Sequence, residues 1–95
     1  MSCIVLQQMT VSDYARFKPI FDEDGHRRER LGSRGGRLLR SASNPGEYVA
    51  ILEWDDLEKA RTFANSLELR EAAEWAGVVG LVKTMVLEEV EPVKA

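Results

Sequence analysis

The sequence has few of the residues that support covalent or metal-based organisation. Its 95 residues include one cysteine, Cys3, and one histidine, His26. A single cysteine excludes an internal disulfide framework and a cysteine-rich metal site. His26 has no second histidine and no carboxylate at metal-ligand spacing, so we expect no metal or other cofactor. Cys3 stands at the start of an apolar strand, where we expect a small buried side chain.

Long apolar runs are also absent. No run approaches the roughly 20 residues that a membrane-spanning helix needs. The start, MSCIVLQQM, has neither the basic region nor the small-residue cleavage site of a signal peptide and is typical of a strand. We therefore expect a cytoplasmic protein without membrane contact. The formal net charge of -3 gives no general reason to expect nucleic acid as a partner.

What the sequence does contain is one globular domain, expected over residues 1–95, with a strand that is apolar on both faces. In YVAILEW, the residues on one face are Tyr48, Ala50, Leu52 and Trp54, and those on the other are Val49 and Ile51. A sheet with one face in water would alternate apolar with polar residues. Helices of so short a chain can cover only one face, so we expect a homodimer in which a second copy covers the other.

The order of elements predicts the fold. We expect strands at 3–10, 37–43, 48–54 and 83–90, and helical segments after caps at Ser12, Asp55 or Asp56, and Ser66. Segment 22–30, DEDGHRRER, is either an extension of the first helix, interrupted at Gly25, or a helix end followed by a loop. Right-handed crossovers then place the first and last strands adjacent in the middle of the sheet, with both helices on one face. This is a ferredoxin-like α+β plait with a four-stranded antiparallel sheet.

Two blocks carry a family resemblance, FDEDGHRRERLGSRGGRLLRSASNP and EWDDLEKARTFANSLELREAAEWAGVVG. With the strand lengths around them, the chain resembles the dimeric α+β barrel superfamily, and within it small proteins of the antibiotic biosynthesis monooxygenase type. The resemblance implies dimerisation through the open sheet face. Some members form quinones without metal or flavin, others degrade heme, and many have no demonstrated reaction. The heme-degrading members rely on an asparagine in the first strand and a histidine in the second helical segment, where this chain has Gln7, Gln8 and no histidine.

Two residues are candidates for proton transfer because of their chemistry. His26 is the one side chain whose ordinary pKa lies near neutrality, but Gly25, Arg27 and Arg28 around it favour a solvated surface position. Glu53 alternates onto the apolar Val49 face. Burial would raise its pKa and make it a base, whereas a pair with Arg40 would make it structural, and we favour the structural role.

The middle of the chain is basic. Residues 16–40 hold eight of the 13 lysines and arginines but four of the 16 acids; the run is Arg27, Arg28, Arg30, Arg34, Arg37 and Arg40. It could bind an anionic ligand, but the neighbouring acids favour ion pairs, and no aromatic residues are interleaved for base stacking. Arg40 is the exception. It lies in a strand beside Leu38 and Leu39, where an inward-facing charge would need a partner, either Glu53 or a ligand carboxylate or phenolate.

Two hypotheses of function stay open. In the first, a pocket between helices and sheet binds a small aromatic or polyketide-like molecule, which is oxidised or cyclised without a cofactor. The candidate proton acceptors are Glu53, His26 and Tyr48, and the candidate ligand contacts are Arg40, Trp54, Phe63 and Trp75. In the second, the domain is a non-catalytic dimeric ligand-binding protein, and both tryptophans lie in the core or at an interface.

Overall fold

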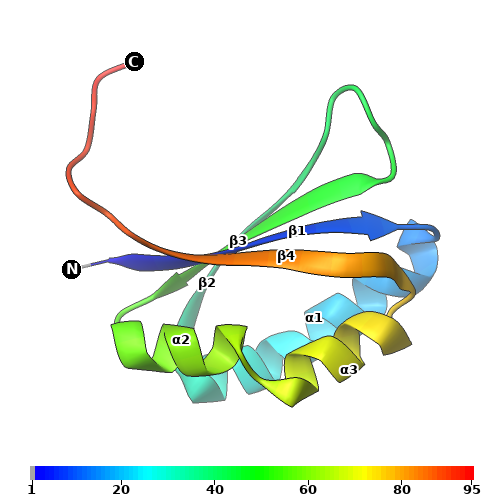
Figure 1. Ribbon diagram of the computed structural model, residues 1–95, viewed down its shortest axis with the longest axis horizontal. Helices are drawn as coiled ribbons and strands as arrows, with labels where there is room; N and C mark the ends of the chain where they lie inside the picture. Colours follow the sequence, from blue (N-terminus) through cyan, green and yellow to red (C-terminus); the bar gives the residue numbers. More distant parts are fainter. Residues whose placement is uncertain (1) are drawn as a thin grey trace.

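Four strands pair into one antiparallel sheet in this computed structural model, which describes residues 2–95. The strands are β1 (Cys3–Val11), β2 (Ser33–Arg40), β3 (Glu47–Trp54) and β4 (Val78–Glu88). The helices α1 (Tyr14–Leu31), α2 (Leu57–Ala64) and α3 (Leu67–Trp75) all lie on one side of the sheet (Figure 1). The ferredoxin-like α+β fold predicted from the sequence is confirmed, with the second helical segment divided at Ser66.

The strand order is β2-β3-β1-β4, which corrects one part of the predicted topology. The first and last strands are adjacent, as expected, but β4 lies at an edge and β1 and β3 form the centre. The reason is that β3 already has two neighbours, its hairpin partner β2 and the central β1. The free side of β1 is then the position left for β4. Leu6 at the centre pairs with Ile51 of β3 and Met85 of β4.

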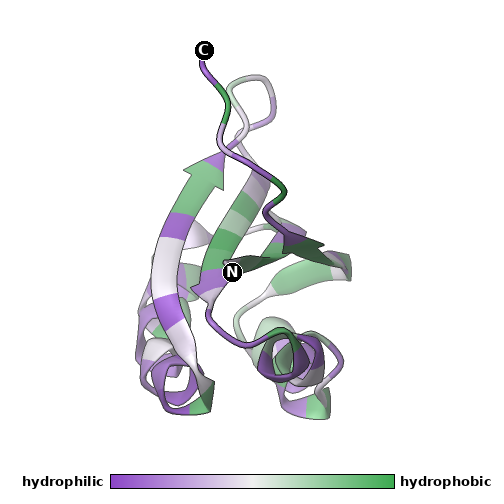
Figure 2. Cartoon of the chain, turned by 90° about the vertical axis from the view of Figure 1, so that its left-hand side faces the viewer, coloured by the Kyte–Doolittle hydropathy of each residue, from purple (hydrophilic) through white to green (hydrophobic). Residues whose placement is uncertain are grey.

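The core fills the layer between sheet and helices. Strand side chains that point toward the helices are buried, including Val5, Ala50 and Leu52. Trp54 is 1% exposed and packs against Phe63 of α2, with ring centroids 5.0 Å apart. The opposite sheet face carries Ile4, Leu6, Val49, Ile51, Leu39 and Met85. In the described part of the chain no helix covers this face (Figure 2).

Helix α1 is longer and starts later than the sequence predicted. Asp13, not Ser12, is its N-cap, and the Asp13 side chain accepts a hydrogen bond of 3.3 Å from the Arg16 backbone N–H. The helix continues through 22–30 without interruption at Gly25 and ends before Gly32, whose φ is 120°. Ion pairs between neighbouring turns support the polar second half, as in Arg27–Asp24.

The glycine-rich segment after α1 is part of β2, which begins at Ser33 and not at Arg37 as predicted. A Cβ on Gly36 would lie 1.7 Å from the Ile51 carbonyl oxygen, so the strand pairing there requires glycine. Gly35, with a φ of 93°, lies at the shift in register between β2 and β3. The sequence alone did not indicate this earlier start, because the close approach depends on a strand distant in the chain.

The caps of the second helical segment were partly predicted. Asp56 caps α2 by accepting a 3.1 Å bond from the Lys59 N–H, so the other candidate cap, Asp55, is not used. Ser66 caps α3 as expected. Strand β4 begins at Val78, well before the predicted Lys83. Within residues 2–95, none of the helices is both long and apolar enough to cross a membrane.

The two tryptophans provide a matched test of the core. Trp54→Ala removes a fully buried indole and is expected to lower the free energy of unfolding by about 3–5 kcal/mol. Trp75→Ala removes the same side chain from a position that is 71% exposed, and a change under about 0.5 kcal/mol is expected. Urea denaturation followed by circular dichroism measures both values. Equal effects of the two substitutions would contradict this assignment of the core.

Candidate ligand-binding site

A small cavity of about 40 Å³ lies between α1, α3 and the helix-facing side of the sheet. Its walls are mostly apolar, and a few polar side chains converge on it. The lining includes Met9, Phe17, Phe21, Leu69 and Val82, together with Gln7, Asp24 and Arg28. An apolar cavity with a few convergent polar groups is the usual form of a small-molecule site. Its volume has room for about two waters.

Gln7 brings an amide into this apolar layer. It follows Val5 on the helix-facing side of β1 and is 5% exposed. Among residues 2–95, no hydrogen-bond partner of its side chain is found. The amide lines the cavity, where its N–H and C=O groups are available to a ligand or a water. Its neighbour Gln8 points to the open face instead.

Arg28 is the second polar group and is also buried, at 9% exposure. One Nη2–H donates a 3.0 Å hydrogen bond to the Phe21 carbonyl, and the guanidinium lies 4.2 Å from the centroid of the Phe21 ring. Its ion pair with Asp24 is long, at 3.6 Å, because Asp24 is held more closely by Arg27 at 2.9 and 3.2 Å. Within residues 2–95, the remaining N–H donors of Arg28 have no close acceptor, and they are not sealed from solvent, because Arg28 also lines the open groove between α1 and β2.

The electrostatics of Arg28 follow from this position. Burial lowers its pKa from the usual value, and this is the largest effect, while the nearby Asp24 carboxylate acts in the opposite direction. The positive charge of Arg27 adds to the lowering. Because the ordinary pKa of arginine is so high, the guanidinium stays charged at neutral pH. The result is a buried cation whose charge is incompletely compensated.

The absence of a side chain at Gly25 leaves space for the Arg28 guanidinium. The Arg28 side chain reaches back along the helix toward the Phe21 carbonyl and passes over Gly25. A Cβ at Gly25 would lie 3.3 Å from Arg28 Nη2, which is closer than ordinary van der Waals contact. A glycine inside a helix costs roughly 1 kcal/mol relative to alanine. Here that cost leaves room for the guanidinium.

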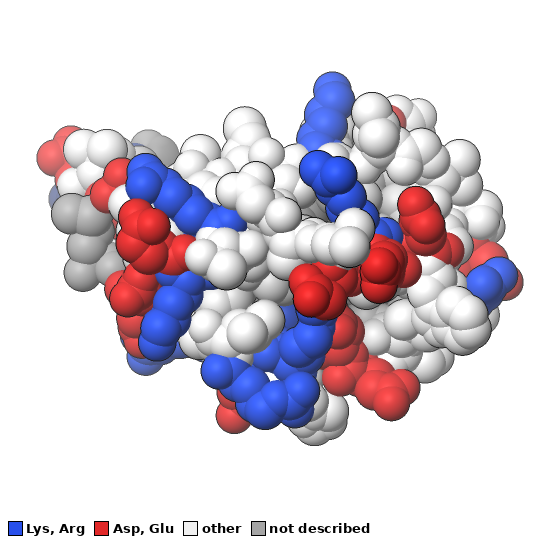
Figure 3. Space-filling model, turned by 60° about the horizontal axis from the view of Figure 1, so that its bottom comes forward, with Lys and Arg blue, Asp and Glu red and all other residues white. Residues whose placement is uncertain are grey.

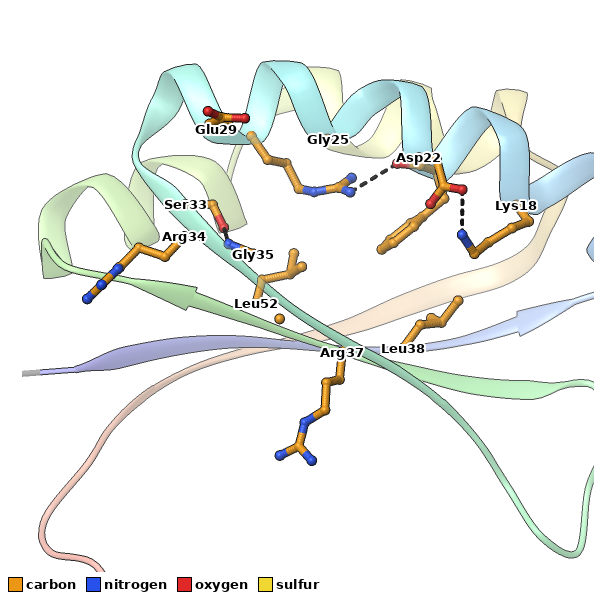
Figure 4. A pocket seen from close by; sticks show the side chains of 13 residues that line it. Lys18, Asp22, Gly25, Glu29, Ser33, Arg34, Gly35, Arg37, Leu38 and Leu52 are labelled. Atoms are coloured by element: carbon orange, nitrogen blue, oxygen red, sulfur yellow. Dashed lines mark hydrogen bonds and ion pairs between the residues drawn. The ribbon is translucent and has the colours of Figure 1, made fainter.

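A larger groove of about 650 Å³ adjoins the cavity, between the second half of α1 and β2. Lys18, Asp22 and Glu29 on α1 face Leu38 and Leu52 on the strands across it (Figure 4). Its floor is open because Gly35 and Gly36 have no side chains. Phe21 and Arg28 line both the groove and the cavity, so these two side chains separate one from the other.

Three of the residues predicted from the sequence lie in the core but do not line the cavity. Tyr48 stacks on Tyr14 at 5.3 Å and on Phe17 at 6.2 Å, which joins it to the aromatic row of α1. Phe17 in turn stacks on Phe21 at 5.3 Å, next to Arg28. Trp54 and Phe63 pack on each other under α2, and the Trp54 indole N–H is buried without a hydrogen-bond partner.

The other four predicted residues are exposed and lie apart from one another. Glu53 is on the open sheet face between Ile4 and Gly35, while Arg40 pairs in register with the inward-facing Tyr48. The two therefore lie on opposite faces and do not form the expected pair. His26 is on the solvent side of α1. Trp75, expected in the core or at an interface, lines a surface hollow with Ile20, Glu23 and Glu71.

The basic run is largely interspersed with acids, as Figure 3 shows for the helix side of the molecule. Arg27 and Arg28 pair with Asp24, and Arg34 pairs with Asp55 at 3.1 Å. These contacts support the ion-pair interpretation for the three arginines concerned. For Arg30, Arg37 and Arg40, no ion pair is found within residues 2–95.

Sequence reasoning did not select Gln7, Asp24 or Arg28 as site residues, although signals for two of them were present. Gln7 is the polar member of an otherwise apolar inward set in β1. Arg28 continues the helical stripe of Tyr14, Phe17 and Phe21, seven residues after the last of these. No group of three histidine, cysteine or carboxylate side chains in the described part of the chain is placed to hold a metal ion.

Comparisons with solved structures establish the class of fold. The chain is similar to a Bordetella bronchiseptica protein assigned to the antibiotic biosynthesis monooxygenases, with 17% identity over 95% of this chain and 98% of that one and a TM-score of 0.77. It is also similar to SnoaB, a cofactor-independent oxygenase from Streptomyces nogalater, with 18% identity over 99% and 98% of the two chains and a TM-score of 0.75. Rv0793 from Mycobacterium tuberculosis gives 16% identity over 99% and 100%, with a TM-score of 0.70.

The chain therefore has the fold of the antibiotic biosynthesis monooxygenase proteins over nearly its whole length, as the resemblance in the sequence predicted. No protein-family model matches the sequence. No curated protein matches it either. At this level of identity, the likeness concerns the fold.

A double-mutant cycle tests the contact between Gly25 and Arg28. In an Arg28→Met background, Gly25→Ala is expected to stabilise the protein by about 1 kcal/mol, the difference in helix propensity. With Arg28 present, the gain is expected to be smaller by about 0.5 kcal/mol or more, because the new Cβ crowds the guanidinium. Urea denaturation of the four proteins measures the coupling. Additive effects would show that Arg28 does not lie over Gly25.

Proposed function

We propose that the protein is a cofactor-independent monooxygenase that acts on a small hydroxylated aromatic molecule in the space between helices and sheet. The observation that carries this proposal is the apolar cavity with Gln7, Asp24 and Arg28 on its walls. The fold shared with SnoaB, itself a cofactor-independent oxygenase, supports the choice of reaction class. The substrate class is chosen because the aromatic and aliphatic walls suit a flat ring.

The chemistry can be balanced without an external reductant. In the conversion of a naphthol to a naphthoquinone, one atom of O2 becomes the new carbonyl oxygen and the other leaves as water. The substrate supplies the hydrogens and the electrons. The protein would contribute exclusion of water, orientation of the ring and stabilisation of the phenolate. Arg28 is placed to favour the phenolate by its charge, and Gln7 to hydrogen-bond the reacting oxygen.

The proposed reaction also needs a proton acceptor. Of the carboxylates in residues 2–95, Asp24 is the one that lines the cavity, where it contacts Arg27 and Arg28. Tyr48, Glu53 and His26 remain predictions from the sequence. With a phenolic substrate, the proton acceptor can be a weak base, because a nearby guanidinium already favours loss of the phenol proton.

We also propose that the functional form is a homodimer closed through the open sheet face. Leu6, Ile51 and Met85 form an apolar band there, and Leu39 and Leu87 extend it. Glu53 and Arg37 lie on the same face, where they could pair across a twofold axis. The cytoplasmic location expected from the sequence stays a prediction.

Sedimentation equilibrium tests the dimer. The wild-type chain is expected at about twice its 10.7 kDa. Leu6→Lys places a charge at the centre of the apolar band and is expected to give a monomer. Leu67→Lys makes the same change at an exposed position on α3 and should leave the dimer intact. A wild-type monomer at micromolar concentration would overturn this proposal.

Oxygen uptake with a panel of naphthols and anthrone-like phenols tests the reaction. An oxygen-dependent quinone product is expected. Gln7→Leu should lower its rate of formation by about 100-fold, the effect of removing a hydrogen-bond donor to a developing oxyanion. Gln8→Leu is the matched control on the opposite face of the same strand and should leave the rate unchanged.

Absence of any oxygen-dependent product across the panel would favour the second candidate function, a non-catalytic dimeric ligand-binding protein. One observation supports that candidate. The sequence-predicted residues Glu53, His26 and Arg40 lie outside the cavity, which leaves few groups for proton transfer.

A further inference from the structure

The separation between the groove and the cavity consists of two side chains, Phe21 and Arg28. The cavity of about 40 Å³ is too small for a ring, whereas the groove of about 650 Å³ is within the usual range of ligand pockets. An aromatic ligand that reaches Gln7 from the groove must therefore displace these two side chains. Their contacts decide what kind of ligand can do so.

We propose that the groove between α1 and β2 admits aromatic anions, and that Arg28 is the residue that recognises their carboxylate or phenolate and opens the way to the cavity. The inference rests on the proposed function for the aromatic part of the ligand. The anionic part follows from Arg28 itself, which is buried, has N–H donors that are not used by protein acceptors, and shares its two nearby carboxylates, with Asp24 also held by Arg27 and Asp22 by Lys18.

An anion in the groove competes with one ordinary hydrogen bond of Arg28, the 3.0 Å bond to the Phe21 carbonyl, and with two weaker contacts. The 3.6 Å pair with Asp24 is longer than a hydrogen bond, and the contact with the Phe21 ring is a cation–π interaction. A carboxylate can instead accept two parallel N–H bonds from the guanidinium fork. When Arg28 turns to the anion, it leaves the face of Phe21, and that ring is then free to change its rotamer.

The other charges of the groove are less suited to this role. Lys18 is paired with Asp22, and Arg34 with Asp55, and both pairs are exposed. Arg37 points away from α1, toward the open sheet face (Figure 4). Glu29 is an exposed acid at the rim and opposes anion binding, but water and salt screen it more than they screen a buried charge.

Isothermal titration calorimetry with naphthoate and its neutral analogue naphthamide tests the recognition. The full-length protein is expected to bind naphthoate at least about 10-fold more tightly than naphthamide. Arg28→Met should abolish this preference and leave the naphthamide affinity within about 3-fold of the wild type. Arg30→Met is the matched control, since Arg30 is exposed in the same last turn of α1 and outside the groove. It should keep the preference.

Three results would overturn the proposal: equal affinity of the wild type for both probes, an unchanged preference in Arg28→Met, or no binding of naphthoate at millimolar concentration. Thermal unfolding establishes that each variant is folded. If Arg28→Met does not fold, Arg28→Lys replaces it, because lysine keeps the charge but loses the fork, and should lower the preference by about 10-fold.

The opening step has its own test. Phe21→Leu removes the ring while keeping Arg28, and stopped-flow fluorescence should show faster association of naphthoate with an unchanged preference over naphthamide. An unchanged association rate would overturn the proposed role of Phe21 in opening the way to the cavity. These binding experiments are independent of oxygen uptake. An Arg28-dependent preference without oxygenation would reject the proposed reaction alone, and oxygenation without the preference would reject the role of Arg28 alone.

Discussion

The sheet is apolar on both faces, yet the helices cover only one, and most other features of the molecule depend on this imbalance. Because side chains alternate along a strand, each strand contributes to two separate surfaces. Gln7 lines the interior cavity, while Gln8 beside it points to the open face. The helix-covered layer therefore holds the candidate site, and the bare layer holds the surface that we propose for dimerisation. The chain is too short to cover both layers itself.

Within the covered layer, Arg28 is the residue that a core selected only for stability would not contain. Burying a guanidinium costs free energy unless its donors are satisfied, and here they are satisfied in part. The Phe21 ring and carbonyl offset some of that cost, and a glycine within the helix makes the arrangement fit. Incomplete satisfaction of a buried charge beside a cavity is typical of a binding site. A methionine, which is shorter and uncharged, would pack there without the penalty.

The fold was largely predictable, because the strands show a period of two and the helices have clear caps. The errors lie where a structure depends on distant contacts. Segment 22–30 has almost no apolar residues, and the burial of an arginine guanidinium against an aromatic ring leaves no hydropathy signal. Gly36 belongs to a strand because of its approach to Ile51, which no local pattern encodes. Trp75 was expected in the core or at an interface, and its 71% exposure excludes the core.

The proposed dimerisation and the proposed ligand selection use opposite faces of the sheet, except at the sheet edge formed by β2. The cavity and the groove lie on the helix side, so closing the open face with a second copy would leave Gln7 and Arg28 unchanged. Strand β2 is the exception, because its glycines leave the groove open at the sheet edge and Arg37 points from there to the open face. A second copy would then adjoin the mouth of the groove but not its floor. Changes on α1 could thus alter which ligand is admitted while the sheet interface stays constant.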